Sequence, residues 1–206
     1  MRIDGVCSSC VRWPYSRCRG RKNQRRSWKR AQGCNHGCVW NRAYEDALLE
    51  LNHVAAAAGF EIVASAAVVA RHSIVPAVGE GRPDVDDRKS ITEFAKNVLV
   101  KLANGDEAPV SVPGNFPYKD CMNLPATPIC LPDCGKCGKC VSTCPTAAMH
   151  IDEDGVKTNV DTCILCLACV SVCPKKARIL PPPLQENMNG KMAALIPVRR
   201  ENEYFL

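Results

Sequence analysis

The fold of this protein is decided by the stretch Cys134-x-x-Cys137-x-x-Cys140-x-x-x-Cys144-Pro145, which recurs as Cys163-x-x-Cys166-x-x-Cys169-x-x-x-Cys173-Pro174. Every cysteine of the first run returns after an offset of 29 residues. Several neighbours return at the same offset: Val141/Val170, Ser142/Ser171, Pro145/Pro174 and Ala148/Ala177. The sequence therefore contains an internal duplication with four thiols in each copy.

The two runs resemble the cysteine run of bacterial ferredoxins that carry two [4Fe–4S] clusters. Two-residue gaps let a loop wrap around one corner of a cubane and present three thiolates to three irons. We expect the fourth cysteine to start a short helix and to point toward the other copy. Cross-ligation follows, with cluster one held by Cys134, Cys137, Cys140 and Cys173, and cluster two held by Cys163, Cys166, Cys169 and Cys144.

Zinc is the alternative ligand for four thiolates. Zinc sites usually use separated pairs of cysteines, whereas each run here has three cysteines at consecutive two-residue gaps. The spacing therefore favours iron–sulfur clusters. Ile164, Leu165 and Leu167 give cluster two a less hydrated wall, while Lys136 and Lys139 lie near cluster one. A dry wall lowers the reduction potential of a cluster and nearby lysines raise it, so the two clusters are expected to differ in potential; the sequence leaves the sign of the difference open.

The predicted fold of residues 133–182 is α+β, a duplicated βαβ ferredoxin-like unit with one short helix after each run. An Asp154-Gly155 turn predicts a hairpin over residues 149–158. His150 is expected to be an exposed strand residue, because the ligand count is already complete. The prolines at 181–183 should end the sheet, and the tail over 183–206 is expected to pack back as a helix.

Residues 41–105 predict part of a doubly wound α/β fold. A helical pattern over 43–58 is followed by Gly59, and the run from Phe60 to Ala70 suits a strand buried on both faces. A second helix is predicted from about Asp87 to Leu102, with Ile91, Phe94, Ala95, Val98 and Leu102 on one face. Helix, buried strand and helix together are typical of a parallel sheet with covered faces.

Three segments of this region resemble the C-terminal half of a flavodoxin-like domain: residues 41–48, Arg71-His72-Ser73 and Gly81-Arg82-Pro83-Asp84. Together with the proline-rich linker over 106–132, they resemble the flavodoxin–ferredoxin fusion proteins of anaerobic bacteria. The resemblance implies FMN as a second cofactor, with the loop Asn41–Tyr44 bordering the flavin ring. The flavodoxin-like half is incomplete, because residues 1–40 contain no Ser/Thr-rich phosphate loop. The alternative for Tyr44 is an aromatic side chain that packs on the sheet.

Residues 1–40 form a basic segment of different composition. They contain ten Lys/Arg and one acidic residue, a net charge of +9, whereas residues 41–206 have a net charge of −3. The apolar residues follow neither helical nor strand spacing, so the segment is predicted to be disordered. Two alternatives remain open: a zinc site built from Cys7, Cys10, Cys34, His36 and Cys38, or a start that is not in the genuine reading frame.

The function predicted is an electron carrier that passes single electrons between redox partner proteins. No residue set forms a catalytic acid, base or nucleophile, so an enzyme is less expected; the alternative is a flavin-dependent oxidoreductase whose flavodoxin-like half feeds the clusters. No nucleic-acid partner is expected, because the body of the protein is mildly acidic. No apolar stretch is long enough for a signal peptide or a membrane span, which predicts a cytoplasmic protein without a membrane partner.

Overall fold

The structure is a computed structural model that describes residues 4–8, 31–39, 41, 43–120 and 125–206. It divides into two compact units. Unit one contains Met1–His72, Ala77–Cys121 and Leu195–Leu206, and unit two contains Ser73–Pro76 and Met122–Ala194.

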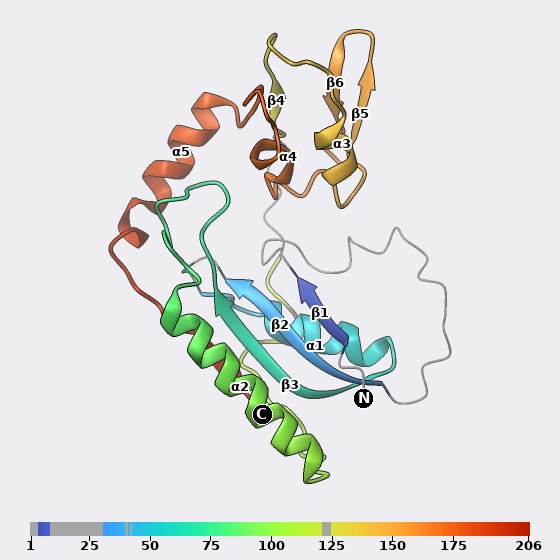
Figure 1. Cartoon of the computed structure of the whole chain (residues 1–206), viewed down its shortest axis with the longest axis vertical. Coiled ribbons are helices and arrows are strands. Elements are labelled where there is room, and N and C mark those ends of the chain that lie inside the picture. Colours follow the sequence, from blue (N-terminus) through green and yellow to red (C-terminus); the bar gives the residue numbers. More distant parts are fainter. Residues whose placement is uncertain (1–3, 9–30, 40, 42, 121–124) are drawn as a thin grey trace. The chain divides into compact units, whose positions relative to one another are not determined.

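Unit one is built on a sheet with the strand order β1-β2-β3-β8 (Figure 1). The strands β1 (Asp4–Ser8), β2 (Ala31–Val39) and β3 (Phe60–Val69) are parallel, and β8 (Glu203–Phe205) runs antiparallel to β3. Five consecutive residues of β3, from Val63 to Ala67, are buried. This burial confirms the prediction of a strand covered on both faces.

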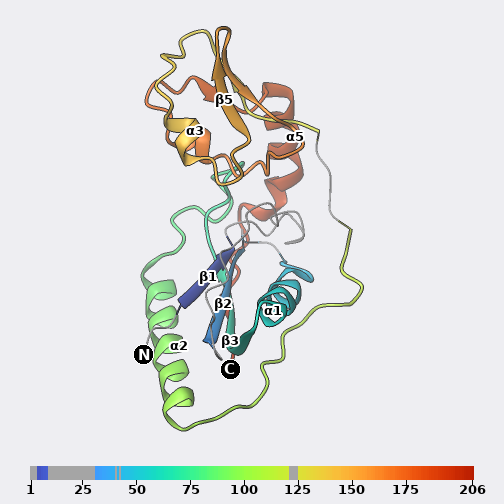
Figure 2. The ribbon, with the colours of Figure 1, turned by 90° about the vertical axis from the view of Figure 1, so that its right-hand side faces the viewer.

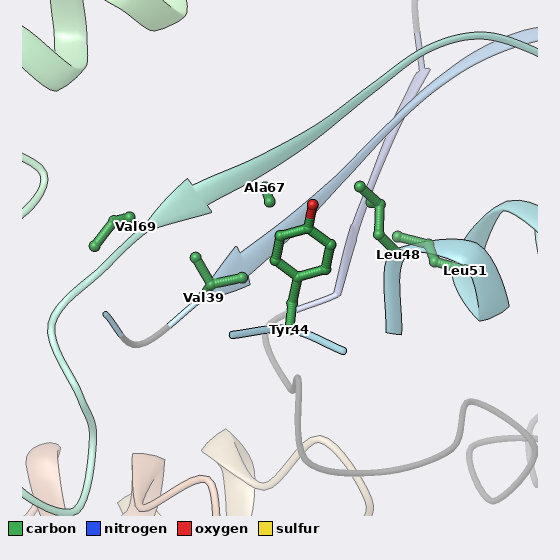
Figure 3. Packing of buried hydrophobic residues seen from close by; sticks show 6 residues of the cluster. All are labelled: Val39, Tyr44, Leu48, Leu51, Ala67 and Val69. Carbon is green, nitrogen blue, oxygen red and sulfur yellow. The ribbon is translucent and has the colours of Figure 1, made fainter. Parts of the chain in front are cut away.

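Two helices cover opposite faces of this sheet, α1 (Ala47–Ala57) and α2 (Val85–Ala103) (Figure 2). The helix α2 agrees with the helix predicted from apolar spacing, although Ala95 is exposed, and α1 begins at Ala47, four residues after the start of the predicted pattern. The core next to α1 consists of Val39, Tyr44, Leu48, Leu51, Ala67 and Val69 (Figure 3). The core next to α2 consists of Val63, Ala64, Ala66, Phe94 and Val98. Helix, strand and helix therefore form a covered layer, as expected for an α/β unit.

Local signals fix the ends of both helices. The helix α1 stops before Gly59, whose φ of 94° is accessible to glycine at little cost. The helix α2 begins with a capping box, in which Asp84 accepts hydrogen bonds from the N–H groups of Asp86 and Asp87. The Asp87 carboxylate in turn accepts the Asp84 N–H at 2.7 Å.

The prediction of disorder for residues 1–40 is wrong at two segments, because β1 and β2 are strands of the sheet. Their pairing partner explains the difference. The buried strand β3 offers backbone groups that must be satisfied, and β2 pairs with it from Ala31↔Phe60 to Val39↔Val69. Backbone hydrogen bonds make this pairing, so it does not require the alternating apolar spacing from which a strand is predicted. The other residues of this segment, 1–3, 9–30 and 40, lie outside the described residues.

The predicted linker over 106–132 is not a free spacer along its whole length. Asp46, which precedes α1, accepts the backbone N–H groups of Asn115 at 2.7 Å and Lys119 at 2.8 Å. These hydrogen bonds lower the pKa of Asp46. Residues as far as 121 belong to unit one, whereas residues from 122 to 194 belong to unit two.

The sequence predicts that the C-terminal tail packs back as a helix, and it ends instead in β8. Two tail residues bind other parts of unit one. Asn202 Oδ1 accepts the N–H of Val69 at 2.7 Å, and the Tyr204 ring stacks on Phe94 with centroids 4.7 Å apart. A helix lies earlier, as α5 (Pro182–Met192), and begins at a proline, which is favourable in a first helical turn. The short 3-10 helix η2 (Ala193–Leu195) follows it.

Unit two contains two βαβ segments in succession. The first is β4 (Ile129–Cys130), α3 (Lys139–Thr143) and β5 (Met149–Asp152), and the second is β6 (Gly155–Thr158), α4 (Ala168–Ser171) and β7 (Arg178–Ile179). β4 pairs with β7, and β5 pairs with β6, both antiparallel. The predicted duplication of a βαβ motif and the predicted hairpin over 149–158 are confirmed.

Candidate iron–sulfur site

The eight cysteines of the two runs lie in unit two as free thiols. The backbone around them repeats with the sequence. Left-handed φ values recur at positions related by the 29-residue offset: Lys136 and Leu165 at 48° and 51°, Gly138 and Leu167 at 76° and 57°, and Ala147 and Lys176 at 52° and 52°. Alternation of right- and left-handed residues turns backbone N–H groups into one concave surface, which is a common cradle for anionic groups and clusters.

The helices do not follow the runs as predicted; each lies inside its run. The helix α3 contains Cys140 and ends before Cys144, which has an extended backbone with φ −69° and ψ 115°. Pro145 is the physical reason, because a proline forces the residue before it out of the helical region. The fourth cysteine of this run is therefore presented by an extended segment rather than by a helix start.

Each fourth cysteine accepts a backbone hydrogen bond in the same way. The Ala148 N–H donates to Cys144 Sγ at 3.3 Å, and the Ala177 N–H donates to Cys173 Sγ at 3.2 Å. For Cys173, burial acts to raise the pKa, but hydrogen bonds from Ala177 and its neighbours outweigh this effect and lower it. Both sulfurs thus have a donor that stabilises negative charge, as a cluster ligand requires.

A recess in unit two is lined by Cys163, Cys166 and Cys169 together with Cys144 of the other run. The remaining wall is mostly apolar, and its residues include Ile164, Leu165, Leu167, Ala148 and Met149. Leu165 and Leu167 are 4% and 8% exposed, so this wall excludes water. The recess brings together the four thiols that cross-ligation assigns to cluster two; their ligation itself stays a prediction.

The thiols assigned to cluster one lie in a more open setting. Cys140 is buried and packs with the half-buried Cys134, whereas Cys137 is exposed. The loop at Gly135 approaches the segment that follows Cys173, because a Cβ on Gly135 would lie 3.5 Å from Cε of Lys175. The segments that carry these four cysteines are therefore neighbours.

Protonation of the buried thiols depends on their surroundings. Burial raises the pKa of Cys140, Cys163 and Cys169, and the positive charge of Arg178 opposes this rise at all three. Metal binding displaces the thiol protons, so iron and protons compete for these sulfurs. Free thiols, N–H donors to sulfur and an apolar recess all fit the [4Fe–4S] clusters that the runs imply.

Sequence reasoning missed two residues of this unit. Arg178 is 2% exposed, although arginine is almost never fully buried without a partner. The only signal for it was a charged residue directly after Ala177, where the first copy has Met149 after Ala148. Cys130, in β4, packs against the buried residues that include Cys140 and Cys169.

His150 is the histidine that lies between the two cysteine runs. It lies in β5 and is exposed, which agrees with the prediction of an exposed strand residue.

The residues expected to border a flavin ring have other roles. Tyr44 is part of the core next to α1, where Figure 3 shows its ring among Val39, Ala67 and Leu48. Asn41 is 1% exposed, and its amide group binds backbone atoms of the C-terminal tail. The packing alternative for Tyr44 is therefore confirmed, and the structure gives no support for FMN at this loop.

The zinc alternative in the first 40 residues gains no support from Cys34. This thiol packs against the core next to α2, and burial raises its pKa, which disfavours the thiolate that zinc requires. Cys10 lies outside the described residues.

Among the residues that the structure describes, no helix is both long and apolar enough to cross a membrane.

A protein-family comparison matches the region of the two cysteine runs. Residues 133–177 match the family described as 4Fe-4S dicluster domain. A stretch of 69 residues is 39% identical to the polysulfide reductase B subunit of Wolinella succinogenes. This stretch is 33% of the present sequence and spans only 30% of that relative's length. Unit two therefore contains a 4Fe–4S ferredoxin-like domain of the kind that transfers electrons, and the likeness to a flavodoxin fusion is not shown.

Proposed function

We propose that this protein is an electron carrier whose ferredoxin-like domain, residues 133–182, holds two [4Fe–4S] clusters and passes single electrons between redox partner proteins. Cluster one is held by Cys134, Cys137, Cys140 and Cys173. Cluster two is held by Cys163, Cys166, Cys169 and Cys144. This exchange of fourth ligands is the known behaviour of the run in two-cluster ferredoxins.

The observation that carries the proposal is the recess in which Cys144 joins three cysteines of the other run. Local ligation would place Cys144 with Cys134, Cys137 and Cys140, which line no part of that recess. The matched hydrogen bonds from Ala148 and Ala177 to the fourth cysteines support equal roles for these two sulfurs.

Bound clusters supply one-electron redox chemistry. The protein's own residues determine where and how easily that chemistry takes place. The N–H groups of Ala148 and Ala177 stabilise negative charge on sulfur, and Leu165 and Leu167 keep water from the recess. Cys137 is the exposed member of its run, so it brings cluster one to the surface, where a partner protein can exchange electrons with it.

The partner is a reductase with its own redox centre. Support comes from the relative, which is the B subunit of a polysulfide reductase. The similarity covers 69 residues and a minor part of that relative, so the sulfur substrate is not carried over to this protein. No catalytic side-chain set is assigned, and the role proposed is electron relay.

The test is the composition and reducibility of protein purified or reconstituted without oxygen. Two cubanes require about eight irons and eight sulfides per molecule. A brown chromophore should bleach with dithionite and recover when an oxidised one-electron acceptor such as cytochrome c is added. About four irons would contradict the two-cluster proposal, and bound zinc without sulfide would contradict the electron carrier.

A further inference from the structure

Arg178 is a charged residue in the interior of unit two. It is 2% exposed, and its guanidinium donates to three oxygen atoms. These are the Pro128 carbonyl at 2.8 Å, the Thr158 hydroxyl at 2.7 Å and the Val156 carbonyl at 3.4 Å. All three acceptors are neutral, so they orient the guanidinium without balancing its charge.

One N–H donor of the Arg178 side chain, Nε, is buried and has no hydrogen-bond partner among the described residues. A buried donor without a partner costs free energy, and a buried charge without a counter-charge costs considerably more. Arginine keeps its proton under ordinary conditions, so it does not escape this cost by becoming neutral. A negative group close to Nε would offset both of these costs.

The neighbours of Arg178 indicate where that negative group lies. Two of its hydrogen-bond acceptors, Pro128 and Thr158, line the recess that also holds Cys144, Cys163, Cys166 and Cys169. The third acceptor, Val156, belongs to the buried cluster that contains Cys140 and Cys169. Cys163 and Cys169 both belong to the run assigned to cluster two, so this cluster is the one that Arg178 faces most directly.

Arg178 has no charged counterpart in the first copy of the duplication. The position of Arg178 in the second copy corresponds to Met149 in the first, and Met149 is also buried, at 5% exposure. Arg178 is the only arginine in the sequence from 122 to 194. The two copies share their cysteine spacing and their loop conformations, yet the equivalent position holds a cation in one and a thioether in the other.

We propose that Arg178 is the buried counter-charge of the cluster pair, that its unpaired Nε–H donates to the Cys169 sulfur once cluster two is bound, and that it selectively raises the reduction potential of cluster two. This inference rests on the proposed function. Reduction adds one electron, taken from a reduced donor protein and later given to an oxidised acceptor, while Arg178 keeps its proton. A nearby cation and an N–H···S hydrogen bond both stabilise the added negative charge, and both affect cluster potentials.

The first test is Arg178→Met, which installs the residue found at the equivalent position of the first copy. The reduction equilibrium constant of cluster two should fall at least tenfold, about 59 mV for one electron, and that of cluster one should fall less. The measurement is a redox titration followed by EPR on anaerobic holoprotein. Unchanged potentials in a fully loaded Arg178→Met protein would overturn the proposal.

Lys157→Met is the matched control. It removes an exposed positive charge from β6, between the two residues whose oxygens bind Arg178. Both potentials should stay close to those of the unmodified protein, because solvent screens an exposed charge. A shift as large as that of Arg178→Met would mean that net charge, and not the buried guanidinium, sets the potential.

Arg178→Lys tests whether the charge of Arg178 alone, or also the geometry of its hydrogen bonds, sets the reduction potential of cluster two. Lysine keeps the charge but lacks the planar fork that reaches three oxygens and a sulfur together. The potential of cluster two should therefore lie between those of the unmodified protein and Arg178→Met. If Arg178→Met does not assemble its clusters, the potential of cluster two is measured in Arg178→Lys instead. An unchanged potential in Arg178→Lys would then contradict the proposed hydrogen bond from Nε–H to Cys169.

A third measurement needs no substitution. Since unit two has a single arginine, holoprotein labelled with ¹⁵N only at the arginine Nε should show ¹⁵N coupling from this one atom in the pulsed EPR spectrum of reduced cluster two. Absence of this coupling, with both clusters present, would overturn the assignment of Nε–H to Cys169. Failure of the proposed function is distinguishable from either result, because it shows as missing iron and sulfide before any potential is measured.

Discussion

The Tyr44 hydroxyl donates a 2.7 Å hydrogen bond to Glu203 Oε2, and so joins the segment before α1 to the last strand of the sheet. Burial and the Glu203 carboxylate both raise the pKa of Tyr44. Asn41 makes a similar connection, because its side-chain oxygen accepts the Arg200 N–H at 2.9 Å. The C-terminal tail thus binds the loop that a flavin ring was expected to border.

We therefore expect the purified protein to release no FMN when it is denatured. Asn41 and Tyr44 direct their polar groups to the tail, and the Tyr44 ring packs in the core. The measurement is fluorescence of the supernatant after heat denaturation, with a known flavodoxin as the positive control. One FMN per molecule would restore the flavin-dependent alternative.

Arg82→Met should lower the free energy of unfolding of unit one by about 3–5 kcal/mol, because it leaves the Asp87 carboxylate buried without its partner. Arg82 and Asp87 are 8% and 1% exposed, and they form a direct ion pair. Hydrogen exchange of the β3 amides measures the effect locally, independent of the clusters. The double variant Arg82→Met/Asp87→Asn should recover part of the loss; a single variant as stable as the parent would contradict the role of the pair.

The stability that the Arg82–Asp87 ion pair contributes depends on pH. Burial acts to raise the pKa of Asp87, but Arg82 and the Asp84 N–H outweigh it and hold the pKa below its ordinary value of 3.8. The stabilisation is therefore fully present above pH 3.8 and is lost as the pH falls through the lower folded-state value. The ¹³C chemical shift of the Asp87 carboxyl carbon should titrate in this lower range in the parent and at higher pH in Arg82→Met. Titration at the same pH in both proteins would contradict the effect of Arg82.

Cys173→Ala should open an iron site on cluster one rather than on cluster two. Cross-ligation assigns Cys173 to Cys134, Cys137 and Cys140, so the EPR spectrum should change as in Cys137→Ala and differ from that of Cys166→Ala. Cys130→Ala is the matched control, since Cys130 is a half-buried cysteine of the same unit outside both runs. If Cys173→Ala instead resembles Cys166→Ala, each run ligates its own cluster.

Deletion of residues 1–40 should leave about eight irons per molecule, as two cubanes require, and should weaken unit one. The segment supplies no proposed ligand, but it contains β1 and β2, and β2 pairs with β3 along nearly all of β3. The expected result is unchanged iron content together with faster hydrogen exchange in β3. Loss of a cluster would show that a cysteine of this segment is a ligand.

The sequence predicts best what is encoded locally. The βαβ duplication, the hairpin at Asp154-Gly155 and the period of α2 depend on residues within a few positions of one another, and each is confirmed in the structure. The helix within the first run is misplaced in the prediction, because Pro145 excludes Cys144 from a helix and this local effect outweighs the expected helix start.

Features made by distant residues were not predictable in the same way. The tail strand β8 pairs with β3, and Asp46 binds residues near 115–119; neither contact leaves a periodic pattern. Arg178 is the clearest example, because its partners Pro128, Val156 and Thr158 lie 20 to 50 positions away and meet it only in the fold. A lone arginine in a sequence is most simply taken for a surface charge.

The division of the protein into two units has a consequence for its response to proteolysis. Most of unit two is an insertion within unit one, since the backbone leaves unit one at residue 121 and returns at residue 195. Both flanks of the insertion are anchored within unit one, through Lys119 on Asp46 and through Asn202 on Val69. Unit two is therefore connected to unit one at both of its ends. After a protease nick in one connection, the other would still hold both units in a single particle and keep their effective concentration for each other high.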